Sequence, residues 1–152
     1  MHVADVMTQA SVSDSPTDTL RAAAETMWRQ QTGSLVVTDG GRMVGIITER
    51  DLLKAVAHGV DLDVATVAEV MTKSVRTATP DEPLRDAARE MAAHWIRHLP
   101  VVVNDQVVGV LSMRDVTGVF AALSKDPAGT DLDVDQLVRE QRLARIEAGD
   151  LD

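Results

Sequence analysis

The chain contains the stretch Val44-Gly45-Ile46-Ile47-Thr48-Glu49-Arg50-Asp51, and 64 residues later it contains Val108-Gly109-Val110-Leu111-Ser112-Met113-Arg114-Asp115. Each stretch is a short apolar run, typical of a buried strand, that ends in a hydroxyl residue. An aspartate stands three positions after each hydroxyl, which is the spacing of the capping box that starts an α-helix. Both stretches therefore predict the same corner, in which a strand passes directly into a helix.

The rest of the chain repeats at the same offset. The stretch Val3-Ala4-Asp5-Val6-Met7-Thr8 returns with a single change, from aspartate to glutamate. When residues 3–8 and 15–51 are aligned with those 64 positions later, 17 of 43 pairs are identical, whereas average composition would give about three. The chain is therefore an internal duplication. A one-residue shift between the aligned blocks is expected to place Val12 opposite Val75.

Each repeat predicts the same elements. A brief extended piece precedes a helix, whose start is indicated by Ser15-Pro16-Thr17-Asp18 and by Thr79-Pro80-Asp81-Glu82, with proline at the first helical position. Two strands follow, joined by tight turns at Asp39-Gly40-Gly41 and at Asn104-Asp105. The last helix starts at the hydroxyl residue of the corner described above.

These elements predict an α+β protein made of two βαββα-type repeats. A unit of roughly 60 residues buries too little surface to be stable alone. We therefore expect residues 1–62 and 63–124 to pack sheet to sheet about a pseudo-twofold axis, with a cleft on that axis. Residues 125–152 do not repeat, and they predict an acidic tail with a helix, which is either a surface helix or a docking element.

Composition and charge limit the classes of function that are expected. The 152 residues include 24 acidic and 15 basic side chains, for a net charge of −9, and the pI is about 4.8. Nucleic acid is therefore not expected as the main partner, because binding to phosphate backbones needs a basic face. The chain has no cysteine, no apolar run near 20 residues and no signal-peptide features, so a cytoplasmic protein without a membrane span is expected. No catalytic constellation is visible, which predicts a protein that is not an enzyme.

The order, length and motifs resemble a tandem pair of cystathionine β-synthase (CBS) domains, also called a Bateman module. The resemblance covers residues 1 to about 124 and rests on the duplicated stretches quoted above and on Leu99-Pro100-Val101-Val102. It implies a stand-alone regulatory module that binds an adenosine-containing nucleotide (AMP, ADP, ATP or S-adenosylmethionine), requires no cofactor and modulates a separate, unknown partner protein. The alternative is a ligand-free CBS scaffold that serves in dimerisation or protein interaction.

The two corners supply the sharpest candidates for ligand binding. The hydroxyls of Thr48 and Ser112, with the free N–H groups of the helix turn that each one opens, form a site that suits a phosphate. The resemblance implies that Asp51 and Asp115 accept hydrogen bonds from the ribose hydroxyls. The alternative is that each pair is simply a helix cap, and a hydroxyl is able to serve both purposes at once.

The copies differ where cations are expected. Arg50 and Arg114 are common to both, but Arg97-His98 of the second copy stands where the first has Gly33-Ser34. We therefore expect unequal sites, of which the second prefers a phosphorylated ligand. The alternative is that Arg97 and His98 are a solvated surface pair.

Apolar and backbone contacts complete the candidate set. Ile46, Ile47, Val110 and Leu111 are suited to hold a purine between them, although alternation along a strand sends about half of these side chains to the core. The resemblance implies that backbone near 12–13 and 75–77 contacts the adenine edge. The predicted ligand-binding residues are Ser13, Ile47, Thr48, Arg50, Asp51, Thr77, Arg97, His98, Leu111, Ser112, Arg114 and Asp115.

The predicted helices carry more apolar residues than two small sheets can cover, among them Trp28, Leu53 and Phe120. CBS pairs typically dimerise through such helices, so we expect a homodimer. His94 and His98 are four residues apart, but a third ligand is not evident and no metal site is predicted.

Overall fold

The computed structural model describes residues 1–13 and 15–123, and the predictions for the tail lie outside these ranges. Residues 1–121 form one compact unit. In chain order the elements are η1 (Val3–Asp5), β1 (Val12–Ser13), α1 (Leu20–Gln30), β2 (Ser34–Asp39), β3 (Arg42–Thr48), α2 (Glu49–Ala57), α3 (Val67–Val70), α4 (Leu84–Ala93), β4 (His98–Val103), β5 (Gln106–Ser112) and α5 (Met113–Leu123). The predicted α+β class with two similar repeats is confirmed.

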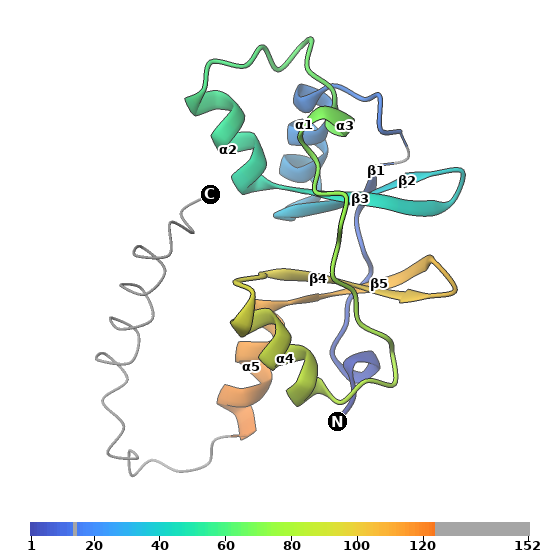
Figure 1. Cartoon of the computed structure of the whole chain (residues 1–152). Coiled ribbons are helices and arrows are strands. Elements are labelled where there is room, and N and C mark those ends of the chain that lie inside the picture. The colour runs from blue at the N-terminus through green and yellow to red at the C-terminus, as the bar shows by residue number, and fades with distance from the viewer. Residues whose placement is uncertain (14, 124–152) are drawn as a thin grey trace. The chain divides into compact units, whose positions relative to one another are not determined.

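The two sheets face each other. β3 contacts β5, and Figure 1 shows α1 and α2 on the outer side of one sheet and α4 and α5 on the outer side of the other. In the first sheet the strand order is β1-β2-β3, while the second consists of β4 and β5. Sheet-to-sheet packing of the two repeats, as the sequence predicts, is therefore what the structure shows.

Both hairpins close as predicted, through turns of two residues. Gly40 and Gly41 have φ values of 59° and 82°, and Asn104 and Asp105 have φ values of 51° and 63°. Two consecutive residues in the left-handed region make the turn that fits the twist of antiparallel strands. Each hairpin also contains one register shift, at the same position of the repeat.

The extended piece at the start of each repeat is shifted from its predicted alignment. Ser13 of β1 pairs in parallel with Val37, and Ala78 makes the equivalent bridge in the second repeat. The prediction that Val12 lies opposite Val75 is therefore wrong by two positions. Hydrogen-bond register sets this alignment, and the residues between the aligned blocks share too little sequence to reveal it.

The first helix of each repeat begins later than predicted. α1 begins at Leu20, with Thr19 as its N-cap, and residues 15–18 form a turn in which the N–H of Asp18 donates to the carbonyl of Ser15. The carbonyls of Pro16 and Asp18 accept hydrogen bonds of 2.8 Å from the first two N–H groups of α3. In the second repeat, the turn before α4 accepts hydrogen bonds from the N–H groups of η1 in the same way. These carbonyls bind the other repeat, which is why the proline does not open the helix.

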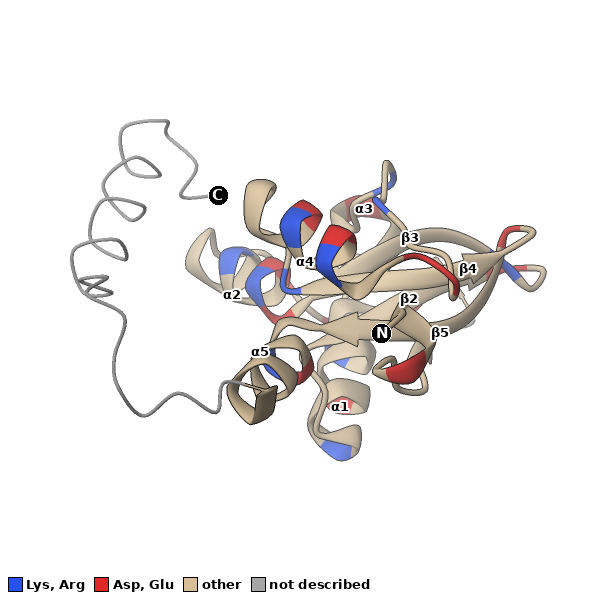
Figure 2. Cartoon of the chain, turned by 90° about the horizontal axis from the view of Figure 1, so that it is seen from below, with Lys and Arg blue, Asp and Glu red and all other residues tan. Residues whose placement is uncertain are grey.

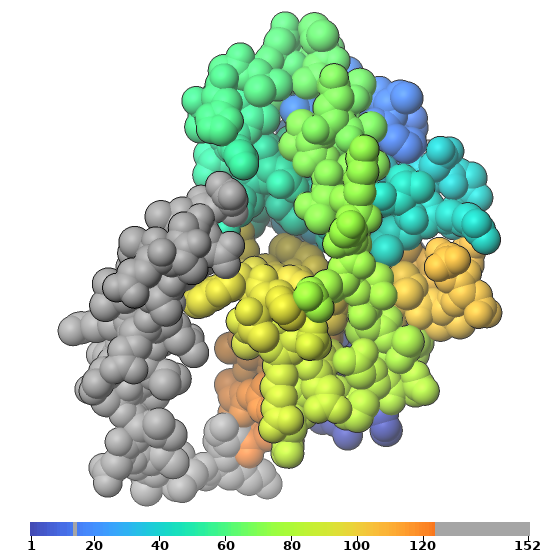
Figure 3. All heavy atoms as spheres, in the orientation of Figure 1, coloured from blue at the N-terminus to red at the C-terminus, as the bar shows by residue number. Residues whose placement is uncertain are grey.

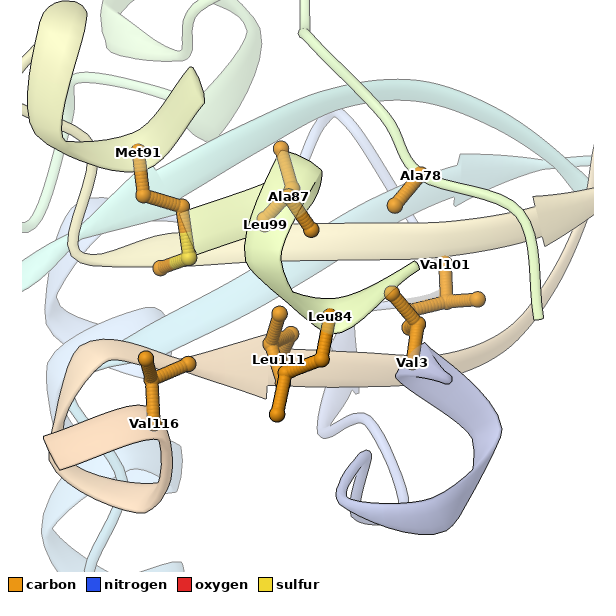
Figure 4. Close-up of a cluster of buried hydrophobic side chains, with 9 residues drawn as sticks. All are labelled: Val3, Ala78, Leu84, Ala87, Met91, Leu99, Val101, Leu111 and Val116. Carbon is orange, nitrogen blue, oxygen red and sulfur yellow. The ribbon is translucent and has the colours of Figure 1, made fainter. Parts of the chain in front are cut away.

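The opening segments of the two repeats are exchanged. Val3 of η1 is fully buried in the core of the second repeat, with Leu84 and Val101, as Figure 4 shows. Val67 of α3 is buried in the same way in the core of the first repeat, with Leu20. Each sequence repeat therefore completes the hydrophobic core of the other, and neither core is made from one repeat alone.

Candidate functional site

The corner between β3 and α2 is held by a capping box, as predicted. Oδ2 of Asp51 accepts hydrogen bonds from the backbone N–H of Thr48 at 2.8 Å and from its hydroxyl at 3.2 Å. At the equivalent corner, the hydroxyl of Ser112 donates to Oδ2 of Asp115 at 2.5 Å and accepts from the backbone N–H of Asp115 at 3.1 Å. Asp51 therefore accepts the N-cap N–H of α2, whereas at the start of α5 the hydroxyl of Ser112 is the cap and Asp115 holds that hydroxyl.

A pocket of about 440 Å³ lies beside the first corner. Four segments line it: the end of β3 with the start of α2, the segment between α3 and α4, the segment between α4 and β4 with the first residue of β4, and Gly33 between α1 and β2. Figure 3 shows the chain between α3 and α4 running along one face, from the first sheet to the second. The lining residues are Gly33, Ile46, Thr48, Glu49, Arg50, Thr72, Ser74, Val75, Arg76, His94, Trp95, Ile96, Arg97 and His98.

Four of the predicted ligand-binding residues line this pocket, namely Thr48, Arg50, Arg97 and His98. They come from different copies of the repeat. The duplicated pattern predicts Arg97-His98 at the second corner, whereas the structure places both residues in the pocket beside the first. The pocket therefore combines the helix N-terminus of one repeat with cationic residues of the other.

Two predicted contacts are wrong. The side chains of Ile47 and Leu111 are fully buried in the two cores, and Figure 4 shows Leu111 among the side chains of the second core. Successive side chains of a strand point to opposite faces, so Ile46 lines the pocket in place of its neighbour.

The remaining predicted residues do not line this pocket. Ser13 is buried, with its hydroxyl 3.4 Å from Oδ2 of Asp18, and Thr77 is exposed. Asp51, Ser112, Arg114 and Asp115 also lie outside the lining. Their roles in ligand binding stay predictions.

Positive charge gathers at the pocket, which is lined by Arg50, Arg76 and Arg97. Figure 2 shows that α2 and α4 also carry both signs of charge. Nη1 of Arg76 lies 3.2 Å from Oε2 of Glu90, and Nη1 of Arg97 lies 3.9 Å from Oε1 of Glu49. The N-terminus of α2 adds the partial positive charge of the helix dipole. This arrangement is suited to bind an anion.

Burial lowers the pKa of His98, and the charge of Arg97 lowers it further. Because the ordinary pKa of histidine is already below 7, this side chain is neutral at pH 7. It therefore offers one hydrogen-bond donor and one acceptor to the pocket, and no charge.

Several lining residues were not among the predicted ligand contacts, including Gly33, Glu49, His94 and Trp95. Trp95 has a φ of 57°, which side chains of its size rarely adopt. Gln31 has a φ of 54° at the equivalent position, so the conformation belongs to the end of the helix in both repeats. Neither residue is the glycine that usually marks such a position, and the sequence therefore gave no signal there.

Within residues 1–13 and 15–123, no group of three or more His, Asp or Glu side chains is arranged to hold a metal ion. Among the described helices, none has the length and apolar character that crossing a bilayer requires.

The chain is a module of two paired repeats. The repeats exchange their opening segments, and residues of both line a pocket with three arginines. A model of the CBS domain matches the chain twice, over residues 3–58 and 67–122. The chain therefore belongs to the CBS domain family, as its resemblance to a tandem CBS pair implied.

Several relatives are similar over nearly their whole length. The CBS domain-containing protein YhcV of Bacillus subtilis is 34% identical over 131 residues, which are 86% of this chain and 91% of that protein. The CBS domain pair of protein MJ0100, solved in complex with 5′-methylthioadenosine and S-adenosyl-L-methionine, has a TM-score of 0.75 and 30% identity, covering 81% of this chain and 98% of that one. The CBS domain protein PAE2072 of Pyrobaculum aerophilum, solved in complex with AMP, has a TM-score of 0.70 and 32% identity, covering 84% and 94%.

Some relatives are much longer proteins. A homoserine O-acetyltransferase of Methanococcoides burtonii is 37% identical over 116 residues, which are 75% of this chain but only 23% of that enzyme. The similarity is therefore to a part of such a protein.

Proposed function

We propose that the pocket binds an adenosine-containing nucleotide (AMP, ADP, ATP or S-adenosylmethionine) and that this binding regulates a separate protein. The observation that carries the proposal is the convergence of Arg50, Arg76 and Arg97 with the N-terminus of α2 on one pocket of about 440 Å³. Pockets of this volume suit small ligands. The complexes of MJ0100 and PAE2072 with adenosine compounds support the same class of ligand.

The lining offers groups for both parts of such a ligand, the purine and the phosphate. Ile46 and Trp95 offer apolar surface for a purine ring. Arg97 and the N-cap residue Thr48 lie where a phosphate would receive charge-assisted hydrogen bonds and the helix dipole.

The segment between α3 and α4 connects the pocket to the hydrophobic core of the first repeat. The N–H groups of Ile46 and Thr72 each donate to the carbonyl of the other residue, at 3.0 and 2.9 Å. Thr72 lies two residues after the end of α3, whose Val67 is buried in the first core. A ligand that contacts this segment differently in two states of the protein would shift the balance between those states, which is how we propose that the partner protein is regulated.

Titration calorimetry with AMP tests the proposal. Arg97→Ala is expected to weaken binding about tenfold or more, because a hydrogen bond to a charged group contributes about 1.5–3 kcal/mol. Arg29→Ala removes the same charge from the exposed last turn of α1 and is expected to leave the affinity unchanged. If no adenine nucleotide binds the wild-type protein, the proposal is wrong and the scaffold function takes its place.

We also propose that the protein is a homodimer. Trp28, Leu53 and Val56 on α1 and α2 are 79%, 70% and 59% exposed, and they are the kind of apolar surface that a second copy would cover. Light scattering at micromolar concentration is expected to give twice the chain mass, whereas a single-chain mass would refute the dimer.

A further inference from the structure

One carboxylate lines the pocket and lies near Arg97. Glu49 is the first residue of α2, and among the described residues that line the pocket it is the one acidic side chain. A Cβ atom built on Gly33 would lie 3.2 Å from Cδ and Oε1 of Glu49 and 3.2 Å from Cε1 of His98. The absence of a side chain at Gly33 therefore leaves room for the carboxylate beside His98. From there its Oε1 reaches to 3.9 Å from Nη1 of Arg97.

The carboxylate and a phosphate would compete for the same positive groups. Both are attracted by Arg97, and both are favoured at the N-terminus of α2. A bound phosphate therefore displaces Glu49 as the partner of Arg97, but Glu49 remains on the helix turn beside it. A second or third phosphate then lies close to a fixed negative charge.

The charge of the pocket suits a single phosphate. Three arginines and one glutamate line it, and one of the arginines, Arg76, also pairs with Glu90 outside the lining. A phosphate monoester carries about −1.5 to −2 at pH 7, which these groups are able to balance. A triphosphate carries roughly twice that charge and exceeds the positive charge available.

We propose that Glu49 selects the ligand by its charge, so that the pocket binds a nucleoside monophosphate in preference to a nucleoside triphosphate. This selection rests on the proposed function of the pocket as a nucleotide site. The duplication supports a selective role, because α5 opens with Met113 at the position that corresponds to Glu49. A helix in this place of the repeat therefore does not need an acidic first residue.

Titration calorimetry of AMP and ATP tests the selection, in buffer without divalent cations. Glu49→Gln removes the charge and keeps the shape, and Glu49→Met installs the residue of the other repeat. In both variants the ratio of ATP to AMP affinity is expected to rise about fivefold or more, because the interaction of two unit charges about 4 Å apart corresponds to about that factor even at the dielectric constant of bulk water. This gain is expected to shrink in 0.5 M salt, because salt screens charges that solvent reaches.

Glu25→Gln is the matched control, because Glu25 is exposed on α1 and does not line the pocket. It is expected to keep the wild-type ratio, and thermal unfolding verifies that all variants fold. A ratio that Glu49→Gln leaves unchanged, or a wild-type preference for ATP, overturns the charge selection. The proposed function still stands if AMP binding depends on Arg97. If neither the wild type nor the variants bind a nucleotide, both proposals fail.

Discussion

Gly45 of β3 lies so close to the segment after α3 that a side chain would not fit between them. A Cβ atom at this position would lie 2.6 Å from Sδ of Met71 and 2.8 Å from the backbone oxygen of Thr72. The methionine side chain is able to turn away, but the carbonyl belongs to the segment that β3 holds by two hydrogen bonds. Gly45→Ala therefore pushes the backbone at Thr72 away from Ile46.

The cost follows from the distances. An ordinary contact of Cβ with oxygen is at least 3.4 Å, so the carbonyl has to move by about 0.6 Å. That movement stretches the mutual hydrogen bonds of Ile46 and Thr72 from 3.0 and 2.9 Å to the limit of hydrogen bonding. Each such bond contributes about 0.5–1.5 kcal/mol, and overpacking of a core costs about 1–3 kcal/mol. We expect Gly45→Ala to lower the free energy of unfolding by about 2 kcal/mol.

Urea unfolding followed by circular dichroism measures this change, and two other glycines serve as controls. At Gly109 the nearest atoms are 2.8 Å away in Met7 and 3.0 Å away in the backbone of Thr8, so Gly109→Ala is expected to cost less. At Gly118, in α5, an added Cβ meets nothing within 4 Å, and alanine is expected to stabilise the helix by about 0.5–1 kcal/mol. If Gly45→Ala is as stable as the wild type, or Gly118→Ala is the least stable of the three, the steric reasoning is refuted.

Three further predictions concern the pocket. Ile47→Val is expected to lower the free energy of unfolding by about 0.5–1.5 kcal/mol with no change in AMP affinity, whereas Ile46→Ala is expected to weaken AMP binding. Urea unfolding measures the first effect and calorimetry the second. If Ile47→Val weakened AMP binding and Ile46→Ala did not, the assignment of Ile46 to the pocket would be wrong. Because the pKa of His98 is lowered in the folded protein, the unfolded chain binds its proton more readily, so stability is expected to fall as the pH drops below about 6.5; His98→Gln is expected to make this fall shallower, and an unchanged pH profile would argue against it. AMP is expected to change the tryptophan fluorescence, and Trp95→Phe is expected to abolish the change while Trp28→Phe retains it; the opposite result would place the ligand elsewhere.

Much of the fold is predictable from the sequence because it depends on local chemistry that occurs twice. Gly40-Gly41 and Asn104-Asp105 are turn residues by their own conformational preference, and both hairpins form where they predict. Thr48 with Asp51 is a cap in any context, and the capping box is present. The starts of α1 and α4 were not predictable in this way. Proline and an acid normally open a helix, but here the carbonyls of the turn bind the other repeat.

The pocket was predictable only in part, for a related reason. Thr48 and Arg50 are marked by the duplicated motif, and Arg97 and His98 stood out because the first copy lacks them. Sequence comparison assigns each residue to its own repeat, however, and the pocket takes its helix N-terminus from one repeat and Arg97 from the other.

The exchange of opening segments makes the two repeats interdependent. Val3 is buried in the second core and Val67 in the first, so unfolding either core exposes an apolar side chain that the other repeat supplies. The pocket lies beside one of the exchanged segments. Thr72 lines the pocket and is hydrogen-bonded to Ile46 of β3, and it stands only two residues after Val70, the last residue of α3. We therefore expect a ligand bound in the pocket to stabilise the packing of α3 on the first core as well as the site itself. In the proposed regulation, this coupling would let a ligand bound beside the first sheet affect both cores without any hinge between two independent domains.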